Sequence, residues 1–127
     1  MFFVKVKTYF SSAHNLRNYK GSCEMLHGHN WVVEATFKGR RLDETGMLFD
    51  FRSARKWLYE VIEGLDHKYL NELPQFKDTN PTSENIARYI FVRLRDKLRK
   101  EQVLKVQVAN ITIWENERSA ASYEEDD

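Results

Sequence analysis

The stretch HGHNWVVEATFK at residues 27–38 decides the fold, because its side chains alternate between two faces along its length. One face carries His27, His29, Trp31, Val33, Ala35 and Phe37. The other face carries Asn30, Glu34, Thr36 and Lys38. Such an alternation is typical of a strand with one face on a core and the other in water. The stretch therefore predicts an antiparallel strand that borders the core.

Three further strands are predicted on either side of this one. Residues 3–14 combine β-branched and aromatic residues with the same alternation, and residues 119–123 indicate a short last strand. Residues 103–115 also indicate a strand, but the parity of their apolar residues changes midway. A β-bulge near Ala109 and Asn110 would reconcile the two halves, because a bulge adds one residue to one strand of a pair.

Two helices are predicted between the second and third strands. Asp50 is a good N-cap for the first helix, whose apolar stripe ends at Leu65. Thr82 is a good N-cap for the second helix, in which apolar residues recur every four positions as far as Leu98. Residues 65–81 have no clean period and predict a loop with local turns.

The order of these elements predicts an α+β fold of the type ββααββ. Its simplest arrangement is one four-stranded antiparallel sheet with both helices on one face. Residues 1–127 are expected to form a single domain, in which residues 124–127 are a mobile tail. Because both edges of the sheet are open, edge-to-edge assembly into a ring is a further expectation.

Composition indicates an ordinary globular domain and argues against several classes of function. The chain has 42% hydrophobic and 31% charged residues, unlike a disordered or a membrane protein. No apolar run approaches the roughly 20 residues that span a bilayer, and a secretory signal is not apparent. A formal net charge of +1 gives no electrostatic reason to expect a nucleic acid or a membrane as partner. The single cysteine, Cys23, cannot form an internal disulfide and fits the reducing cytoplasm.

Three histidines lie on the first two predicted strands. His27 and His29 leave the same face of their strand about 7 Å apart along its axis. His14 ends the preceding strand, and a hairpin-like connection would place it beside them. Three imidazoles with an open fourth position are typical of catalytic zinc, although iron or manganese would also accept imidazole. We therefore expect these three histidines to bind one divalent cation, most simply zinc.

Other groups could take part in the chemistry, and each has a plain structural alternative. Cys23 could be a thiolate base or a fourth metal ligand, and its spacing from the histidines does not decide between them. Asp66 and His67 could transfer protons as a pair if a turn brings them together, or they could be structural. Glu115 could accept two parallel hydrogen bonds from an amidine-type edge, or it could be a solvated strand end.

Five segments carry a resemblance to a known family. They are FSSAH at residues 10–14, CEMLHGHN at 23–30, LDH at 65–67, PTSEN at 81–85 and Glu115. Together they resemble the 6-pyruvoyltetrahydropterin synthase / 6-carboxytetrahydropterin synthase family over nearly the whole chain. The spacing Cys-x3-His-Gly-His, with an upstream Ala-His and a downstream Leu-Asp-His, is the specific part of this signature.

The resemblance implies a fold, an assembly and a set of site residues. The implied fold is the tunnelling fold, in which subunits join their sheets into a barrel and two rings stack. The usual assembly is a homohexamer with active sites at the subunit interfaces. The resemblance implies His14, His27 and His29 as zinc ligands, Cys23 as the base, Asp66 and His67 as the proton relay, Glu115 as the anchor of the pterin's amino-pyrimidinone edge, and Thr82 and Ser83 as residues that line the pterin pocket.

The implied substrate is a pterin, 7,8-dihydroneopterin triphosphate. The three-residue gap between Cys23 and His27 resembles the branch whose products are 6-carboxytetrahydropterin, acetaldehyde and triphosphate, a step toward queuosine. A 6-pyruvoyltetrahydropterin synthase is the alternative. Glu24 resembles family members that release 6-hydroxymethyldihydropterin for folate synthesis, and it could equally be a surface residue. Arg17 and Lys20 could receive the phosphates, by their charge and position.

A function of another class is a non-catalytic module in which zinc is structural. Cys23 would then close the site as a fourth ligand, and removal of the metal would unfold the chain. This alternative leaves Asp66, His67 and Glu115 without a purpose, which favours the lyase.

Overall fold

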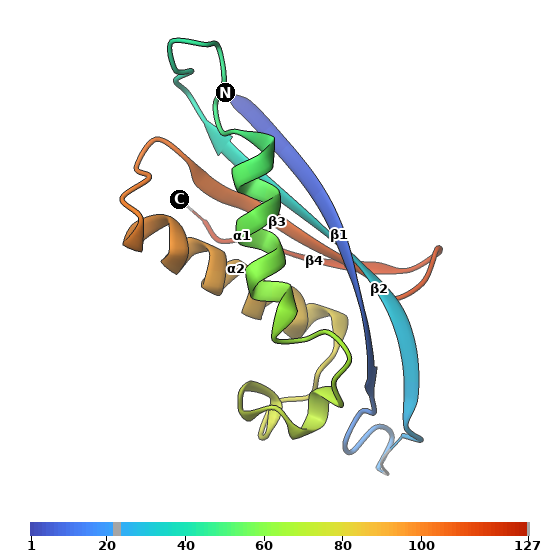
Figure 1. Cartoon of the computed structure of the whole chain (residues 1–127). Helices are drawn as coiled ribbons and strands as arrows, with labels where there is room; N and C mark the ends of the chain where they lie inside the picture. The colour runs from blue at the N-terminus through green and yellow to red at the C-terminus, as the bar shows by residue number, and fades with distance from the viewer. Residues whose placement is uncertain (22–23, 127) are drawn as a thin grey trace.

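The computed structural model describes residues 1–21 and 24–126, which contain one antiparallel sheet (Figure 1). Its strands lie in the order β1-β2-β3-β4, and each pairs with the next strand in the chain. The strands are β1 (Phe2–His14), β2 (His27–Gly39), β3 (Gln107–Trp114) and β4 (Ala120–Tyr123). The four-stranded sheet predicted from the alternating side chains is therefore confirmed.

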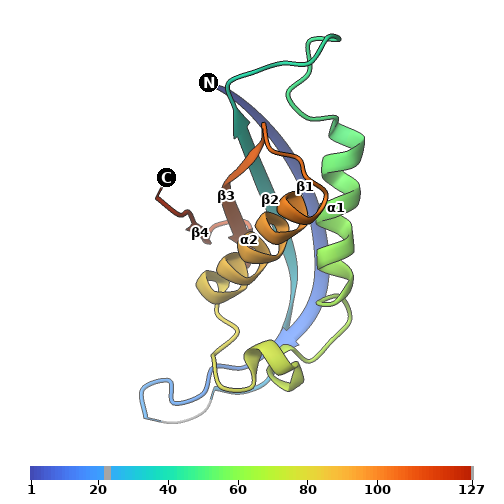
Figure 2. The same ribbon diagram turned by 90° about the vertical axis from the view of Figure 1, so that its left-hand side faces the viewer.

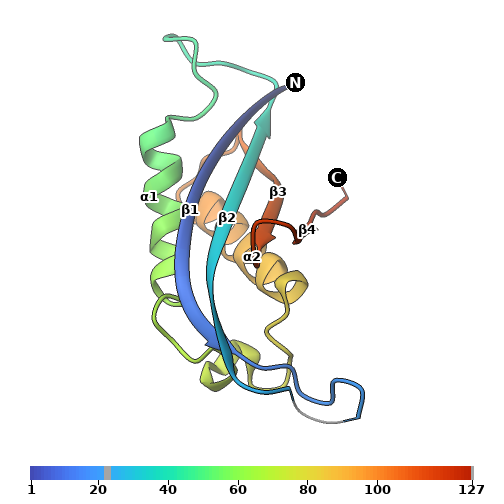
Figure 3. The same cartoon turned by 90° about the vertical axis from the view of Figure 1, so that its right-hand side faces the viewer.

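Both helices cover the same face of the sheet, as Figures 2 and 3 show from two sides. Helix α1 (Phe51–Glu63) packs on β1, and helix α2 (Ser83–Lys100) packs on β3 and β4. The predicted N-caps, Asp50 and Thr82, each accept a hydrogen bond from a backbone N–H of the first turn. Leu65 lies beyond the end of α1, where the first helix was predicted to end, but it is still buried. Within the described residues, no helix is both long enough and apolar enough to cross a membrane.

The core lies between the sheet and the two helices. The predicted apolar face of β2 supplies four fully buried side chains, Trp31, Val33, Ala35 and Phe37. The helices add Leu58, Ile62, Ile90 and Leu94. Each large apolar side chain buried here contributes about 1.5–3 kcal/mol. Their packing fixes the helices on the sheet.

A β-bulge interrupts the pairing of β2 with β3. Thr36 lies opposite Asn110, whereas the next residue, Phe37, lies opposite Val108. Ala109 is therefore the extra residue on β3. The bulge predicted from the change of parity is confirmed.

Strand β3 begins at Gln107, later than the predicted residue 103. Residues 101–106 instead turn the chain from the end of α2 back to the sheet, with Gln102 at a φ of 56°. Leu104, which the sequence assigned to the same face as the core residues, is 84% exposed. The alternation of apolar residues continues through this turn, and for that reason the strand was predicted too long.

The segment between the helices runs along the end of β1. It contains two short 3-10 helices, η1 (Leu70–Glu72) and η2 (Pro74–Phe76), in keeping with the predicted loop. The backbone N–H of Ala13 donates to the carbonyl oxygen of Lys68 at 3.0 Å. This hydrogen bond joins the segment to the end of the sheet where β1 ends and β2 begins.

The residues after β4 make side-chain contacts with α2 and β3. The Glu125 carboxylate lies 2.5 Å from the Arg95 guanidinium of α2 and accepts a hydrogen bond from the Tyr123 hydroxyl at 2.8 Å. Glu124 accepts a hydrogen bond from the Asn110 side chain at 2.8 Å. The expected mobility of the C-terminal tail stays a prediction.

Gly39, at the end of β2, has no room for a side chain. A Cβ atom there would lie 2.5 Å from the carbonyl oxygen of Lys105 and 2.5 Å from Cδ1 of Leu48. We expect Gly39→Ala to lower the free energy of unfolding by about 1–3 kcal/mol, because an added methyl group in a filled site forces the backbone apart. Urea denaturation followed by circular dichroism would measure the loss.

Gly64→Ala is the matched control for this prediction. The nearest atom to a Cβ at Gly64 is 3.7 Å away, and its φ of −71° suits any residue. Its free energy of unfolding should stay constant or rise slightly. Equal losses in the two variants would contradict the close approach at Gly39.

The Glu125 contacts predict a pH-dependent contribution to stability. Hydrogen bonds from Tyr123 and Arg95 lower the pKa of the Glu125 carboxyl group. A lowered pKa stabilises the fold above the unfolded-state value of about 4.3, and this contribution is lost as the pH falls through the folded-state pKa. Glu125→Gln should therefore destabilise the protein near pH 7 and have a smaller effect below about pH 4.

Chemical denaturation of both proteins at a series of pH values would test this dependence. Glu117→Gln is the control, because Glu117 is exposed and lies away from α2 in the turn after β3. A difference between wild type and Glu125→Gln that stays constant with pH would exclude the ionised carboxylate as its source.

Candidate metal centre

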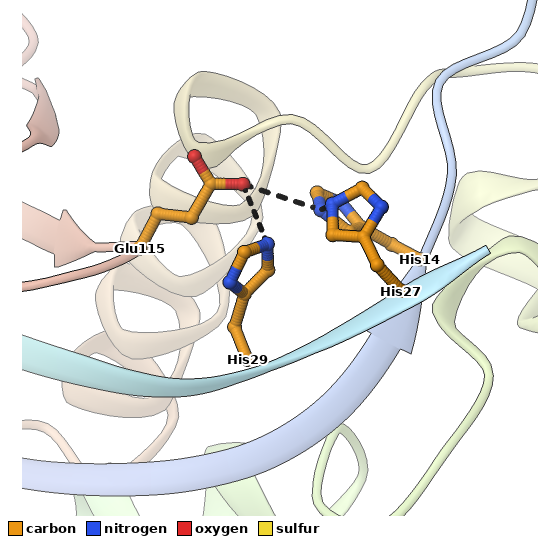
Figure 4. Close-up of side chains that lie close together, drawn as sticks. All are labelled: His14, His27, His29 and Glu115. Carbon is orange, nitrogen blue, oxygen red and sulfur yellow. Dashed lines mark hydrogen bonds and ion pairs between the residues drawn. The ribbon is translucent and has the colours of Figure 1, made fainter. Parts of the chain in front are cut away.

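Three histidines and one glutamate meet at one end of the sheet (Figure 4). His14 ends β1, His27 begins β2 directly opposite it, and His29 follows on the same face. Glu115 comes immediately after β3. One potential ligand atom from each of the four side chains lies within 4.8 Å of the other three. The sheet therefore brings together the three predicted metal ligands and the predicted pterin anchor.

Backbone carbonyl groups orient two of the imidazoles. Nδ1 of His14 lies 2.8 Å from the carbonyl oxygen of Pro81, and Nδ1 of His27 lies 2.9 Å from that of Met25. A carbonyl oxygen can only accept, so both Nδ1 atoms carry a hydrogen, and in the neutral tautomer that this selects each Nε2 atom presents a lone pair. These Nε2 atoms are 3.0 Å apart. Two lone pairs at this distance repel each other unless a cation or a proton lies between them.

Glu115 lies against the same nitrogen atoms. Its Oε1 atom is 2.9 Å from Nε2 of His29 and 3.3 Å from Nε2 of His14. Despite the short distance, Nε2 of His29 is buried and makes no hydrogen bond to any described residue. Burial lowers the pKa of His29, and the neighbouring His14 and His27 lower it further against the opposing effect of Glu115. The neutral form of His29, which is the form that binds metals, is therefore favoured.

These distances fit a divalent metal ion. Zinc–nitrogen bonds of about 2.0–2.1 Å in a tetrahedral site place the ligand atoms roughly 3.3 Å apart. The His14–His27, His14–Glu115 and His29–Glu115 separations are 3.0, 3.3 and 2.9 Å. Three neutral imidazoles and a carboxylate suit zinc, and they also suit iron or manganese. The donor set, together with a buried His29 nitrogen atom that makes no hydrogen bond to any described residue, makes this cluster a candidate metal centre.

The Trp31 side chain packs against two histidines of the cluster from the side of the core. Its buried indole lies edge-on to His14 at 4.8 Å and to His29 at 5.0 Å between ring centroids, and its Nε1–H donates to the carbonyl oxygen of Ser12. The sequence placed Trp31 on the core face but gave it no part in the site. Its parity, shared with His27 and His29, is the signal that could have indicated this contact.

Asp66 and His67 form a pair at the edge of β1. Oδ1 of Asp66 lies 3.0 Å from Nδ1 of His67 and accepts a hydrogen bond from the backbone N–H of Ser11 at 2.9 Å. That backbone hydrogen bond is the main reason why the pKa of Asp66 is lowered. His67 has a φ of 55°, which supplies the turn that pairing of these neighbours requires.

The pair lies near the metal cluster, although the two are separate groups. His67 is 82% exposed and lines a hollow of about 500 Å³ that His29 and Gly28 also line. A group bound in this hollow could contact both histidines. The structure thus gives Asp66 and His67 the geometry of a proton-transfer pair, and their function stays a prediction.

The start of α2 also borders the cluster. Thr82 accepts the capping hydrogen bond from the backbone N–H of Asn85, and Pro81, just before it, holds His14 through its carbonyl oxygen. Thr82 and Ser83 therefore lie at the border of the cluster, and their contact with a pterin stays a prediction. The sequence could not indicate the role of the Pro81 carbonyl group, because every residue has a backbone carbonyl group.

The remaining predicted groups have different surroundings. The Arg17 guanidinium donates to the carbonyl oxygens of Asn71 and Thr79 at 2.9 and 3.4 Å, so it holds the loop in place. The Lys20 ammonium lies over the ring of Tyr19 at 5.4 Å. Cys23, the predicted base, lies outside the described residues.

The fold and the cluster together define an α+β domain of the tunnelling-fold class with a candidate metal-binding site at one end of its sheet. A family model described as 6-pyruvoyl tetrahydropterin synthase matches residues 3–126. The chain belongs to the 6-pyruvoyl tetrahydropterin synthase family, as the five sequence segments indicated.

Individual relatives carry two different names. A 6-carboxy-5,6,7,8-tetrahydropterin synthase of Synechocystis sp. is 37% identical over 92 residues, which are 68% of this chain and 70% of the relative. A 6-pyruvoyl tetrahydrobiopterin synthase of Dictyostelium discoideum is 32% identical over 124 residues, with 85% and 91% of the two chains covered. The solved structure of Caenorhabditis elegans 6-pyruvoyl tetrahydropterin synthase is 26% identical, has a TM-score of 0.81 and matches over 98% and 96% of the two chains.

The cluster predicts that metal binding depends on His27. We expect the purified wild-type protein to retain about one divalent metal ion per chain, and His27→Ala to lose most of it, because one imidazole ligand is gone. Elemental analysis by mass spectrometry after dialysis would measure the metal content.

His67→Ala is the matched control, since His67 is exposed and lies outside the cluster. It should retain its metal, and circular dichroism should show that both variants are folded. Equal metal content in His27→Ala and wild type would contradict the proposed ligand set.

Proposed function

We propose that this protein is a 6-carboxy-5,6,7,8-tetrahydropterin synthase that converts 7,8-dihydroneopterin triphosphate to 6-carboxytetrahydropterin, acetaldehyde and triphosphate. The observation that carries the proposal is the convergence of three imidazoles and a carboxylate at one end of a sheet of this family. The name of the Synechocystis relative supports this branch. So does the three-residue gap between Cys23 and His27, which resembles the same branch.

Zinc is the metal that we propose for the cluster, with His14, His27 and His29 as its ligands. When bound, zinc would act as a Lewis acid that polarises a hydroxyl or carbonyl oxygen of the substrate side chain. The chain's contribution is to hold the imidazoles in a fixed orientation before the metal binds. The carbonyl groups of Pro81 and Met25 supply that orientation from outside the ligand set.

Proton transfer is proposed for Cys23 and for the Asp66–His67 pair. A thiolate near a dication is a usable base near neutral pH, which supports Cys23 in that role. In the second group, Oδ1 of Asp66 lies 3.0 Å from Nδ1 of His67. The carboxylate thereby keeps the hydrogen of the neutral ring on Nδ1. Nε2 of His67 is therefore the atom that could accept a proton from the substrate, and the high exposure of this ring makes it accessible.

Substrate binding is proposed for Glu115, Thr82 and Ser83. A carboxylate can accept two parallel hydrogen bonds from the amino-pyrimidinone edge of a pterin. Glu115 lies beside the three histidines, so a pterin bound to it would lie next to the proposed metal. Thr82 and Ser83 begin the helix whose start borders the same cluster.

We further propose a homohexamer of two stacked trimers in the cytoplasm. Strand β1 pairs with β2 on one side only, and its other edge is covered at residues 11–13 by the segment that carries His67. Strand β4 is the other edge of the sheet. The β4 edge and the part of the β1 edge before residue 11 support the joining of sheets between subunits, with active sites at the interfaces. A single cysteine in the sequence fits a reducing compartment.

Product identification is the direct test of the proposed function. Incubation of the metal-loaded protein with 7,8-dihydroneopterin triphosphate should yield 6-carboxytetrahydropterin and acetaldehyde, as measured by liquid chromatography and mass spectrometry. Cys23→Ala should lower turnover by about 100-fold or more while the metal is retained, because a general base is removed and the ligands are not.

Each alternative outcome would indicate a different function. A pyruvoyl-pterin or a hydroxymethyl-pterin as product would replace the proposed branch with one of the other two. Loss of both metal and fold in Cys23→Ala would favour the non-catalytic module in which the thiolate closes a structural zinc site.

A further inference from the structure

The turn between α1 and η1 lies along one edge of β1. The backbone N–H of His67 donates to the carbonyl oxygen of Ser11 at 2.6 Å, and the backbone N–H of Ala13 donates to the carbonyl oxygen of Lys68 at 3.0 Å. Successive residues of a strand present their backbone groups to opposite edges. Ser11 and Ala13 therefore hold the turn with their backbone groups, whereas the backbone groups of Ser12, between them, point toward β2.

Ser12 reaches the same turn with its side chain. Its hydroxyl group donates to the carbonyl oxygen of Leu65 and accepts a hydrogen bond from the backbone N–H of Lys68 at 3.1 Å. A hydroxyl group can form both bonds at once, because it carries one hydrogen and two lone pairs. Asp66 and His67 lie between the two bonded residues, so one hydroxyl group joins the two ends of the turn that carries them.

Ser12 also belongs to the rigid part of the sheet. It is a buried polar residue on the core face of β1, and it pairs with His29 of β2. Its carbonyl oxygen accepts the hydrogen bond from the indole of Trp31 at 3.2 Å. Loss of its hydroxyl group would remove a partner from the buried carbonyl oxygen of Leu65, and such a loss is costly where water cannot take its place.

The conformation of His67 makes these hydrogen bonds important. Its φ of 55° lies in the left-handed region, which a residue with a side chain adopts only when its surroundings fix it. The ring of His67 is 82% exposed, so packing of the side chain holds the turn little. In this conformation Nδ1 of His67 lies 3.0 Å from Oδ1 of Asp66. Relaxation of the turn would separate the two side chains.

We propose that Ser12 is a positioning residue for the Asp66–His67 pair: its buried hydroxyl group holds the turn in the conformation that brings the two side chains together. This inference rests on the proposed function, in which the pair transfers a proton. The hydroxyl group itself transfers none, because its partners are backbone groups. Ser11 also holds Asp66, but through a backbone N–H group, so the side chain matters at position 12 and not at position 11.

Two substitutions at position 12 test the hydroxyl group. Ser12→Ala removes it, and the turnover number should fall roughly 10-fold or more, because a small displacement of a reacting group is enough for such a loss. KM and the metal content should stay near the wild-type values, since neither the proposed pterin anchor nor a metal ligand is changed. Ser12→Thr keeps a hydroxyl group, and its turnover number should be close to that of wild type.

Hydrogen exchange gives a readout that does not depend on activity. The backbone amide of Lys68 should exchange roughly 10-fold faster in Ser12→Ala than in wild type, because it loses its acceptor. Ser11→Ala is the matched control for this measurement. The Ser11 hydroxyl group is exposed and donates to the Asn30 side chain, and the backbone N–H of residue 11 still reaches Asp66. The amide of Lys68 should therefore exchange at the wild-type rate in Ser11→Ala.

Gly39→Ala is the control for a general loss of stability. Gly39 lies opposite Phe2, at the end of the sheet away from the histidines, where an added methyl group has no room. At a temperature at which thermal unfolding shows every variant to be folded, Gly39→Ala should keep the wild-type turnover number. A loss equal to that of Ser12→Ala would attribute both effects to stability and would overturn the proposal.

Two further results would also overturn it. One is a Ser12→Ala variant in which either the exchange of the Lys68 amide or the turnover number is unchanged. The other is a Ser12→Thr variant that protects this amide as wild type does and yet turns over as slowly as Ser12→Ala. If the wild-type protein does not convert the pterin triphosphate, the proposed function fails, whereas amide exchange still shows whether the hydroxyl group of Ser12 holds the turn.

Discussion

The approach of two imidazole nitrogen atoms, both presenting lone pairs, is the interaction on which the site depends. Nε2 of His14 and Nε2 of His27 are 3.0 Å apart, and hydrogen bonds from Nδ1 to the carbonyl oxygens of Pro81 and Met25 fix the tautomers. Such a contact is repulsive in itself, and the surrounding fold has to maintain it. A bound cation makes the same geometry favourable. The contact therefore lowers the stability of the metal-free fold while it raises the affinity of the site for a metal ion.

Several elements far apart in the sequence share the task of maintaining this contact. The register of β1 with β2 sets His14 opposite His27, and Trp31 supports the rings from the core. The start of α2 supplies the Pro81 carbonyl group. The buried apolar face fixes the strands and the helix relative to one another. The same packing keeps the polar cluster rigid.

Much of the fold and of the cluster could be predicted from the sequence, because the signals are local. Alternation and N-caps indicated the strands and helices, and the parity of His27 and His29 indicated a shared ligand face. The carbonyl groups of Pro81 and Met25 could not be found, since every residue has a carbonyl oxygen and only tertiary structure selects one. The paired hydrogen bonds of Ser12 were missed for the same reason, and the exposed Leu104 shows that alternation can continue outside a strand.

The single extra residue at Ala109 has an effect at the opposite end of its strand. Before the bulge, even-numbered positions such as Val108 face the helices, and after it odd-numbered positions such as Ile113 do. Glu115 belongs to the odd series and so reaches the histidines, while Trp114 is turned to the uncovered side, where it donates to Glu34. If β3 instead paired with β2 without a bulge, Ala109 would take an ordinary place in the alternation, and Trp114 rather than Glu115 would face the histidines. An irregularity of one residue in the backbone, well away from the cluster, therefore decides which side chain of β3 reaches it.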